Sequence, residues 1–207
     1  MRVRTRIFLL LLIALALGTG PAVAQSTTDY RVRDETSRLA VAVLGRVCLM
    51  NLGDINAVIT AAAPGGEFGF IDAPLDVAKT LLQGRTGYVR VLRRSGLGAI
   101  TLVVGHDGIC SVWSEYADIT AIQRHLLAMV ERGGLKGGGQ LLALDSRDSE
   151  GIRYNDYYLV PTGWFATQLG KRFNDDGTQP LALVTIIAPP GRNPMEAVLS
   201  ASRPLKR

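Results

Sequence analysis

The sequence predicts an α+β domain: an antiparallel sheet of five to six strands, with an N-terminal helical part and one long helix packed on one face. Apolar residues recur at helical spacing up to about residue 84, and strand-like runs begin near residue 88. One strongly amphipathic helix follows Asp118. The only two cysteines, Cys48 and Cys110, fall on the inner faces of a predicted helix and a predicted strand. No internal repeat is evident.

Residues 1–24 form a predicted signal peptide. Three arginines precede an apolar run at 7–17, and Ala22-Val23-Ala24 is the small-x-small pattern that signal peptidase cleaves. As a helix this run spans about 17 Å, whereas a bilayer core is about 30 Å thick. We therefore expect a mature chain of residues 25–207, forming one α+β domain in the periplasm or secreted, without stable membrane insertion. An uncleaved anchor is the less favoured alternative.

The charge of the mature chain argues against a nucleic-acid partner. The whole chain carries +5, and removal of the three signal arginines leaves +2. Nucleic-acid binding requires basic residues clustered on one face. The nearest approach to such a cluster is Arg90, Arg93 and Arg94, together with the tail Arg203, Lys206 and Arg207. The alternating arginines are interpreted as the solvated face of a strand.

The N-terminal part contains three predicted helices. The first runs from about 34 to 51 after a short lead-in at 28–33, and Cys48 lies on its apolar stripe. Asp54 is placed to cap the second, and Pro74 to start the third. The inner side of the third helix is predicted to comprise Leu75, Ala78, Leu81 and Leu82.

Strands then alternate with turns. Cys110 and Val112 share one predicted strand face, and Trp113 lies on the other. The strands are predicted at 88–94, 99–104, 109–116, 140–144, 152–160 and 181–188. A polar loop is expected at 145–151, segment 164–173 fits either a strand or a helix, and Asn193 is expected to start a short terminal helix.

The two cysteines are predicted to form a structural disulfide. An exported chain with two cysteines most often bonds them, and a redox pair would normally be close in sequence. The 62-residue separation corresponds to roughly 4 kcal/mol in the chain-entropy model.

No pattern in the sequence identifies a catalytic residue, a metal site or a cofactor. His106 and His125 lack a nucleophile and an orienting acid at recognisable spacing. The glycine-rich segment 133–139 follows a helix and has Gly137 where a phosphate loop needs Ser or Thr. The acidic segments at 145–150 and 175–176 match no calcium-loop spacing.

A concentration of aromatic residues is the one candidate binding surface. Such side chains serve both binding surfaces and sheet cores, and the sequence leaves both interpretations open. The group comprises Tyr154, Tyr157, Tyr158, Trp164 and Phe165.

The segment from Cys48 to the helix after Asp118 resembles an uncharacterised family of small exported proteins from Gram-negative bacteria. The resemblance rests on the helix-borne Cys48, on Ile109-Cys110-Ser111-Val112 and on the helix that follows. It implies an envelope location and no particular activity. The sequence thus favours a non-enzymatic binding or accessory protein of the envelope, with an unknown envelope protein or small ligand as partner. The alternative is an envelope hydrolase.

Overall fold

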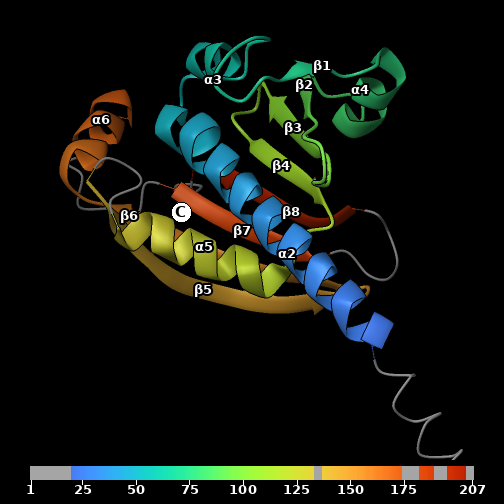
Figure 1. The fold of residues 1–207 in the computed structure, drawn as a ribbon. Coiled ribbons are helices and arrows are strands. Elements are labelled where there is room, and N and C mark those ends of the chain that lie inside the picture. Colours follow the sequence, from blue (N-terminus) through green and yellow to red (C-terminus); the bar gives the residue numbers. More distant parts are fainter. Residues whose placement is uncertain (1–19, 133–136, 174–181, 189–194, 204–207) are drawn as a thin grey trace, which may run out of the picture.

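A computed structural model describes residues 20–132, 137–173, 182–188 and 195–203, and these form an α+β fold around one antiparallel sheet (Figure 1). The sheet has eight strands in the order β1-β2-β3-β4-β8-β7-β6-β5. Their bounds are β1 Ile71–Asp72, β2 Gly87–Leu92, β3 Ile100–Gly105, β4 Cys110–Glu115, β5 Gly139–Ser149, β6 Ile152–Pro161, β7 Ala182–Ala188 and β8 Met195–Ser202. The predicted class is confirmed, and the predicted number of strands is too low.

The strand order divides the molecule into two topologically similar halves. In each half a helix precedes a meander of four antiparallel strands, and the two meanders join where β4 pairs with β8. The first helix, α2 (Gly20–Val43), continues into a π-helical turn, η1 (Leu44–Cys48), and a 3-10 turn, η2 (Leu49–Asn51). The corresponding helix of the second half is α5 (Ile119–Glu131).

Helices α2 and α5 pack side by side on the sheet (Figure 1). They run antiparallel, because Asp34 on α2 contacts His125 whereas Ser37, further along α2, contacts Asp118 at the start of α5. The sheet face beneath them supplies alternate residues of each strand to a common core. Fully buried members from the central strands are Ile100, Leu102, Val112, Val184, Ile186, Ala197 and Leu199.

Three short helices complete the fold. They are α3 (Ile55–Ala61), α4 (Leu75–Leu82) and α6 (Gly163–Phe173). Asp54 caps α3 as predicted, its carboxylate accepting a hydrogen bond from the Ala57 N–H at 3.0 Å. The predicted inner side of α4 is confirmed in part: Ala78, Leu81 and Leu82 are half-buried where α4 packs on β2 and β3, whereas Leu75 is 71% exposed and no residue of α4 is fully buried.

Four further expectations from the sequence are corrected or resolved. Residues 28–33 belong to α2 rather than to a lead-in, and 164–173 is helical. The expected loop at 145–151 is largely strand, because β5 continues to Ser149 and turns into β6 through Glu150 and Gly151, both at positive φ. The expected terminal helix is strand β8, which fills the slot between β4 and β7. Its start signal at 193–194, the glycine-rich residues 133–136 and the acidic turn 175–176 lie outside the described residues.

Candidate functional site

The Cys48–Cys110 disulfide is present, with Cα atoms 5.6 Å apart, and confirms the predicted pairing. Cys48 is the last residue of η1, and Cys110 is the first residue of β4. Both side chains are buried. The bond therefore ties the end of the α2–η1 helical segment to the middle of the sheet.

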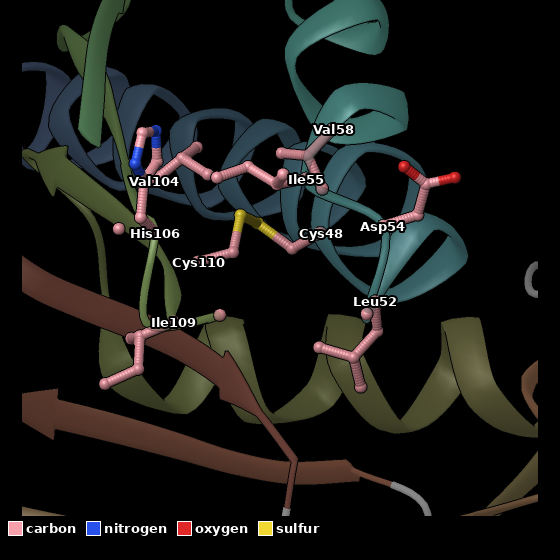
Figure 2. A pocket seen from close by; sticks show the side chains of 12 residues that line it. Cys48, Leu52, Asp54, Ile55, Val58, Val104, His106, Ile109 and Cys110 are labelled. Carbon is pink, nitrogen blue, oxygen red and sulfur yellow. A yellow bond between two sulfur atoms is a disulfide. The ribbon is translucent and has the colours of Figure 1, made fainter. Parts of the chain in front are cut away.

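A pocket of about 160 Å³ lies beside this disulfide, between α3 and the turn that joins β3 to β4 (Figure 2). We call it the disulfide pocket. Its lining residues include buried Val58 and Val104 as well as the two cysteines, and these form the floor. Exposed Asp54 and His106 stand at the rim. The remaining lining residues are Leu52, Gly53, Ile55, Gly105, Gly108 and Ile109.

Local sequence explains both walls of the disulfide pocket. Gly53, at φ +83°, reverses the chain after η2, so that the capped helix α3 starts beside the disulfide. On the other wall, Gly108 at φ +84° closes the β3–β4 turn, and the Asp107 carboxylate accepts the Ile109 N–H at 3.1 Å. The turn presents His106 to solvent, where its ring stacks against Tyr88 at 5.6 Å between centroids.

The disulfide pocket is a small cavity with a mainly apolar lining. An apolar protein cavity of about 150 Å³ holds one benzene molecule. The Asp54 carboxylate at the rim already accepts the hydrogen bond that caps α3. This bond uses one of the two Asp54 carboxylate oxygens, and the His106 ring makes no hydrogen bond or ion pair with any described residue.

A second cavity, of about 290 Å³, lies against α2, and we call it the arginine groove. Helix α2 contributes one wall, and the loops at 67–68 and 94–97 contribute the other. Three arginines and two glutamates line it together with apolar side chains. The lining residues are Glu35, Arg38, Leu39, Ala42, Arg46, Glu67, Phe68, Arg94 and Leu97.

The arginine groove changes the interpretation of the basic cluster. Arg90 is not on a solvated face: its side chain is 14% exposed and forms an ion pair with Asp72. Arg93 is exposed, and Arg94 is exposed at the margin of the groove. The three arginines thus have three different environments.

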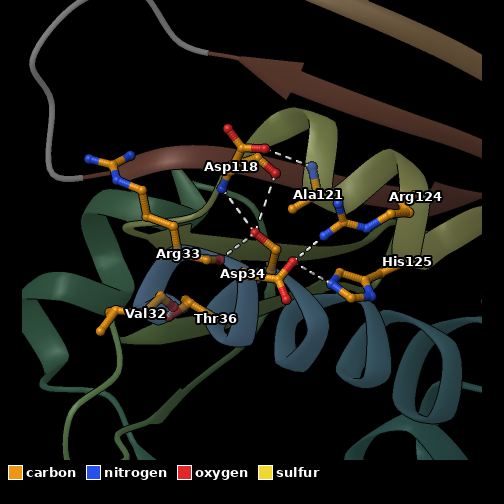
Figure 3. Close-up of polar contacts among 9 residues, drawn as sticks. Val32, Arg33, Asp34, Thr36, Asp118, Ala121, Arg124 and His125 are labelled. Carbon is orange, nitrogen blue, oxygen red and sulfur yellow. Dashed lines mark hydrogen bonds and ion pairs between the residues drawn. The ribbon is translucent and has the colours of Figure 1, made fainter. Parts of the chain in front are cut away.

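His125 belongs to a polar joint between α2 and α5, shown in Figure 3. Its Nε2 lies 3.0 Å from the Asp34 carboxylate, which also binds Arg124. A hydrogen bond to Tyr30 and the nearby charge of Asp34 raise the pKa of Arg124, so this cation stays protonated. The His125–Asp34 pair lines neither the disulfide pocket nor the arginine groove.

The same joint contains a buried hydroxyl and a helix cap. The Ser37 hydroxyl accepts a hydrogen bond from the Asp118 N–H at 2.9 Å and donates one to the Arg33 carbonyl at 2.7 Å. The Asp118 carboxylate accepts the Ala121 N–H at 2.7 Å, which confirms the predicted cap of α5. These contacts bind the two helices together, and Ser37 is committed to backbone groups.

The three tyrosines of the aromatic group lie on opposite faces of β6. Tyr154 and Tyr158 share one face, and Tyr157 points to the other, because side chains alternate along a strand. The Tyr157 ring packs against the core, and its hydroxyl accepts a hydrogen bond from Gln123 at 3.1 Å. The Tyr154 ring lies beneath the Arg147 guanidinium, at 4.9 Å.

The two remaining aromatic residues are also separated, although they are adjacent in α6. Phe165 is fully buried in the core, whereas Trp164 is 48% exposed. The five aromatic residues therefore do not form one continuous surface. A partner surface built from the group stays a prediction for Tyr154, Tyr158 and Trp164.

Two acidic side chains of the predicted loop at 145–150 form ion pairs with arginines. Asp148 forms an ion pair with Arg153 at 3.1 Å, and Asp145 lies 3.7 Å from Arg147. Within the described ranges no group of three or more His, Cys, Asp or Glu residues could hold a metal ion.

Neither cavity could be predicted from the sequence, because each is lined by segments that only the fold brings together. The disulfide pocket joins 48–58 to 104–110, and the arginine groove joins 35–46 to 67–68 and 94–97. The one usable signal was the predicted bond between Cys48 and Cys110, which placed the first two segments near each other.

Comparison of the chain with protein-family models, with curated proteins and with solved structures found no match. In the part of the chain that the structure describes, no helix combines the length and the apolar character needed to cross a bilayer.

Proposed function

We propose that this chain is an exported, non-enzymatic binding protein that receives one small uncharged group, about the size of a benzene ring, in the disulfide pocket. The observation that carries the proposal is the pocket itself: a volume of about 160 Å³ with a buried apolar floor and an exposed rim. A preformed concave apolar site of this kind is the usual form of a ligand pocket.

Covalent bracing supports a role in recognition. The disulfide joins η1 to β4, and residues of both segments line the pocket. The floor is thereby held in place before any ligand arrives. A preorganised site loses less conformational entropy on binding, and more of the contact energy is then available as affinity.

The size of the pocket limits what it can take. Pockets for whole drug-sized ligands measure about 300–1,000 Å³. The disulfide pocket is about half the lower limit and suits a single ring or branched alkyl group. The ligand is accordingly a very small molecule, or the anchoring group of a larger one whose remainder extends past His106 at the rim.

An exported location is part of the proposal. The disulfide is of the kind that persists in oxidising compartments, and the first 24 residues have the composition of a signal peptide. Intact-mass measurement of protein recovered from the exporting cell should give a chain that begins at Gln25 or within a few residues of it. Full-length chain in the membrane fraction would contradict the exported, soluble state.

The hydrolase alternative has less support. It requires a histidine and a hydrogen-bonded carboxylate in one pocket. His125 has the carboxylate of Asp34 but lines neither cavity, and His106 lines a cavity but has no carboxylate partner among the described residues. The paired histidine and the pocket that such a site requires thus lie in different parts of the molecule.

Toluene is a suitable probe for the disulfide pocket. We expect saturable one-to-one binding of toluene in calorimetric titration, and its loss in Ile55→Phe, because Ile55 lines the pocket and a larger side chain there fills it. The matched control is Ile59→Phe, one turn along α3, which is also half-buried but does not line the pocket. It should bind toluene as the parent protein does.

Two results would overturn the proposal. One is the absence of saturable toluene binding by the folded parent protein. The other is equal binding by Ile55→Phe and Ile59→Phe, when thermal unfolding shows both variants to be folded.

A further inference from the structure

We infer that the arginine groove is a second, independent binding site, which takes a small amphipathic anion: one carboxylate or phosphate group attached to a short apolar body. The groove and the disulfide pocket lie on different sides of the same helical segment. Arg46 lines the groove and Cys48, two residues further on, lines the pocket, and no residue lines both cavities. A ligand in one cavity therefore leaves the other open.

Uncommitted positive charge is the first argument. Arg46 forms an ion pair with Glu67 across the groove. Arg38 and Arg94, one on each wall, make no hydrogen bond or ion pair with any described residue. Two guanidinium groups thus face one cavity with their donors available. Guanidinium groups match the planar, two-oxygen edge of a carboxylate or phosphate, to which they donate paired hydrogen bonds.

The floor of the groove is apolar and supports the second part of the inference. Leu39 and Phe68 are each more than nine-tenths buried, and Leu97 is half-buried beside them. A purely hydrophilic ion would leave this surface wet. A ligand with an alkyl or aryl body would cover it while its headgroup reaches the two arginines.

Glu35 limits the charge of the ligand. It lines the groove and makes no ion pair with any described residue. Arg46 and Glu67 neutralise each other. The remaining charged groups of the lining are two arginines, Arg38 and Arg94, and one glutamate, Glu35. The groove therefore favours a compact anion of low charge, and removal of the Glu35 charge should strengthen binding because one repulsive group is lost.

The groove volume, about 290 Å³, is close to the lower limit of ordinary small-molecule pockets. We select N-acetyl-leucine as a carboxylate probe and isobutyl phosphate as a phosphate probe. Two control compounds test the contributions of the charge and of the apolar body separately. N-acetyl-leucinamide keeps the apolar body without the charge, and inorganic phosphate keeps the charge without the body.

Titration calorimetry at low salt should show saturable binding of N-acetyl-leucine, isobutyl phosphate or both, and the tighter of the two identifies the headgroup. Arg38→Gln and Arg94→Gln should each weaken this binding about fivefold, the effect of losing one ion pair near the surface. Their combination should weaken it more than either alone. Glu35→Gln should tighten it. Raising the salt concentration to 0.5 M should weaken it in the parent protein.

Arg93→Gln is the matched control, because Arg93 is exposed and adjacent to Arg94 but does not line the groove. It should leave binding within twofold of the parent value. Thermal unfolding shows whether each variant is folded, and toluene binding in the disulfide pocket should be unchanged in every arginine variant.

Several outcomes would overturn the inference. Equal weakening by Arg93→Gln and Arg94→Gln would assign binding to general surface charge. Equal binding of N-acetyl-leucinamide would remove the need for an anion, and equal binding of inorganic phosphate would remove the need for an apolar body. Absence of saturable binding by both charged probes would reject the site. Failure of toluene to bind would leave these results unaffected, because the two cavities are separate.

Discussion

The two halves of the molecule have the same topology but are built differently. Each places one helix on a four-stranded antiparallel meander, and the halves meet at the β4–β8 pair and at the α2–α5 joint. In the second half, α5 leads to the meander through residues 132–138. In the first half, η1, η2 and α3 lie between α2 and β1, and α4 lies between β1 and β2. Both cavities are lined only by residues of the first half.

The difference shows how cavities arise on a regular sheet. Long paired strands such as β5 and β6 leave little space, because their register sets the position of every side chain. Short elements pack less regularly. Helix α3 has seven residues with one buried, and α4 has none buried. The two cavities thus lie among the less regular elements of the first half, and the proposed binding sites belong to that half.

The largest effect is expected inside the second half, at the adjacent aromatic residues of α6. Phe165→Ala removes a fully buried ring, and we expect it to lower the free energy of unfolding by about 3–5 kcal/mol. Trp164→Ala is the control, and it should lower that free energy by less than about 1 kcal/mol because the ring is 48% exposed. Urea denaturation measures both. Similar losses for the two variants would show that Trp164 is also a core residue.

The next largest effect on stability is expected from loss of the Cys48–Cys110 disulfide in the first half. Reduction of the disulfide, or the double variant Cys48→Ser, Cys110→Ser, should lower the free energy of unfolding by up to roughly 4 kcal/mol, because the bond closes a 62-residue separation. Toluene affinity should fall as well, since the bond forms the pocket floor. A free-thiol assay of the native oxidised protein should find no titratable cysteine. Reaction of both cysteines in that assay would contradict the bonded state.

A smaller effect distinguishes the two helix caps. Asp118→Ala should lower the free energy of unfolding by about 1 kcal/mol, since its carboxylate caps α5 at the joint between the halves. Asp54→Ala removes the equivalent hydrogen bond from α3, a seven-residue insertion. Its global effect should be smaller, and its effect on toluene binding larger. The reverse order would show that α3, rather than the α2–α5 joint, holds the fold together.

Local patterns predicted the elements for which capping and the spacing of apolar residues agree. Helix α5 begins after Asp118 as expected because its cap and apolar stripe agree. The disulfide was predicted because Cys48 shares an inward face with Val47, and Cys110 shares one with Val112. All four residues are buried. Strands β2, β3, β4, β6 and β7 were found within a few residues of their ends.

Strand β8 shows where local reasoning failed. The pattern Asn-Pro-Met-Glu, whose last two residues begin β8, is typical of a helix start and predicts a terminal helix. However, Ala197, Leu199 and Ala201 alternate with Val198, Ser200 and Ser202, and all three are fully buried between β4 and β7. Pairing on both sides outweighs a weak local preference. The cavities were unpredictable for a related reason, since Arg38 and Arg94 become neighbours only through the tertiary fold.

The most direct test of this account is a toluene titration of methyl-labelled protein, followed residue by residue by NMR. We predict that the methyl signals of Val58, Val104 and Ile109 shift together along one saturating curve, because these residues line the disulfide pocket. The signals of Leu142 and Ile187, on strands of the second half, should stay in place. Shifts centred on Leu142 and Ile187, with none at Val58 and Val104, would contradict the assignment of binding to the first half.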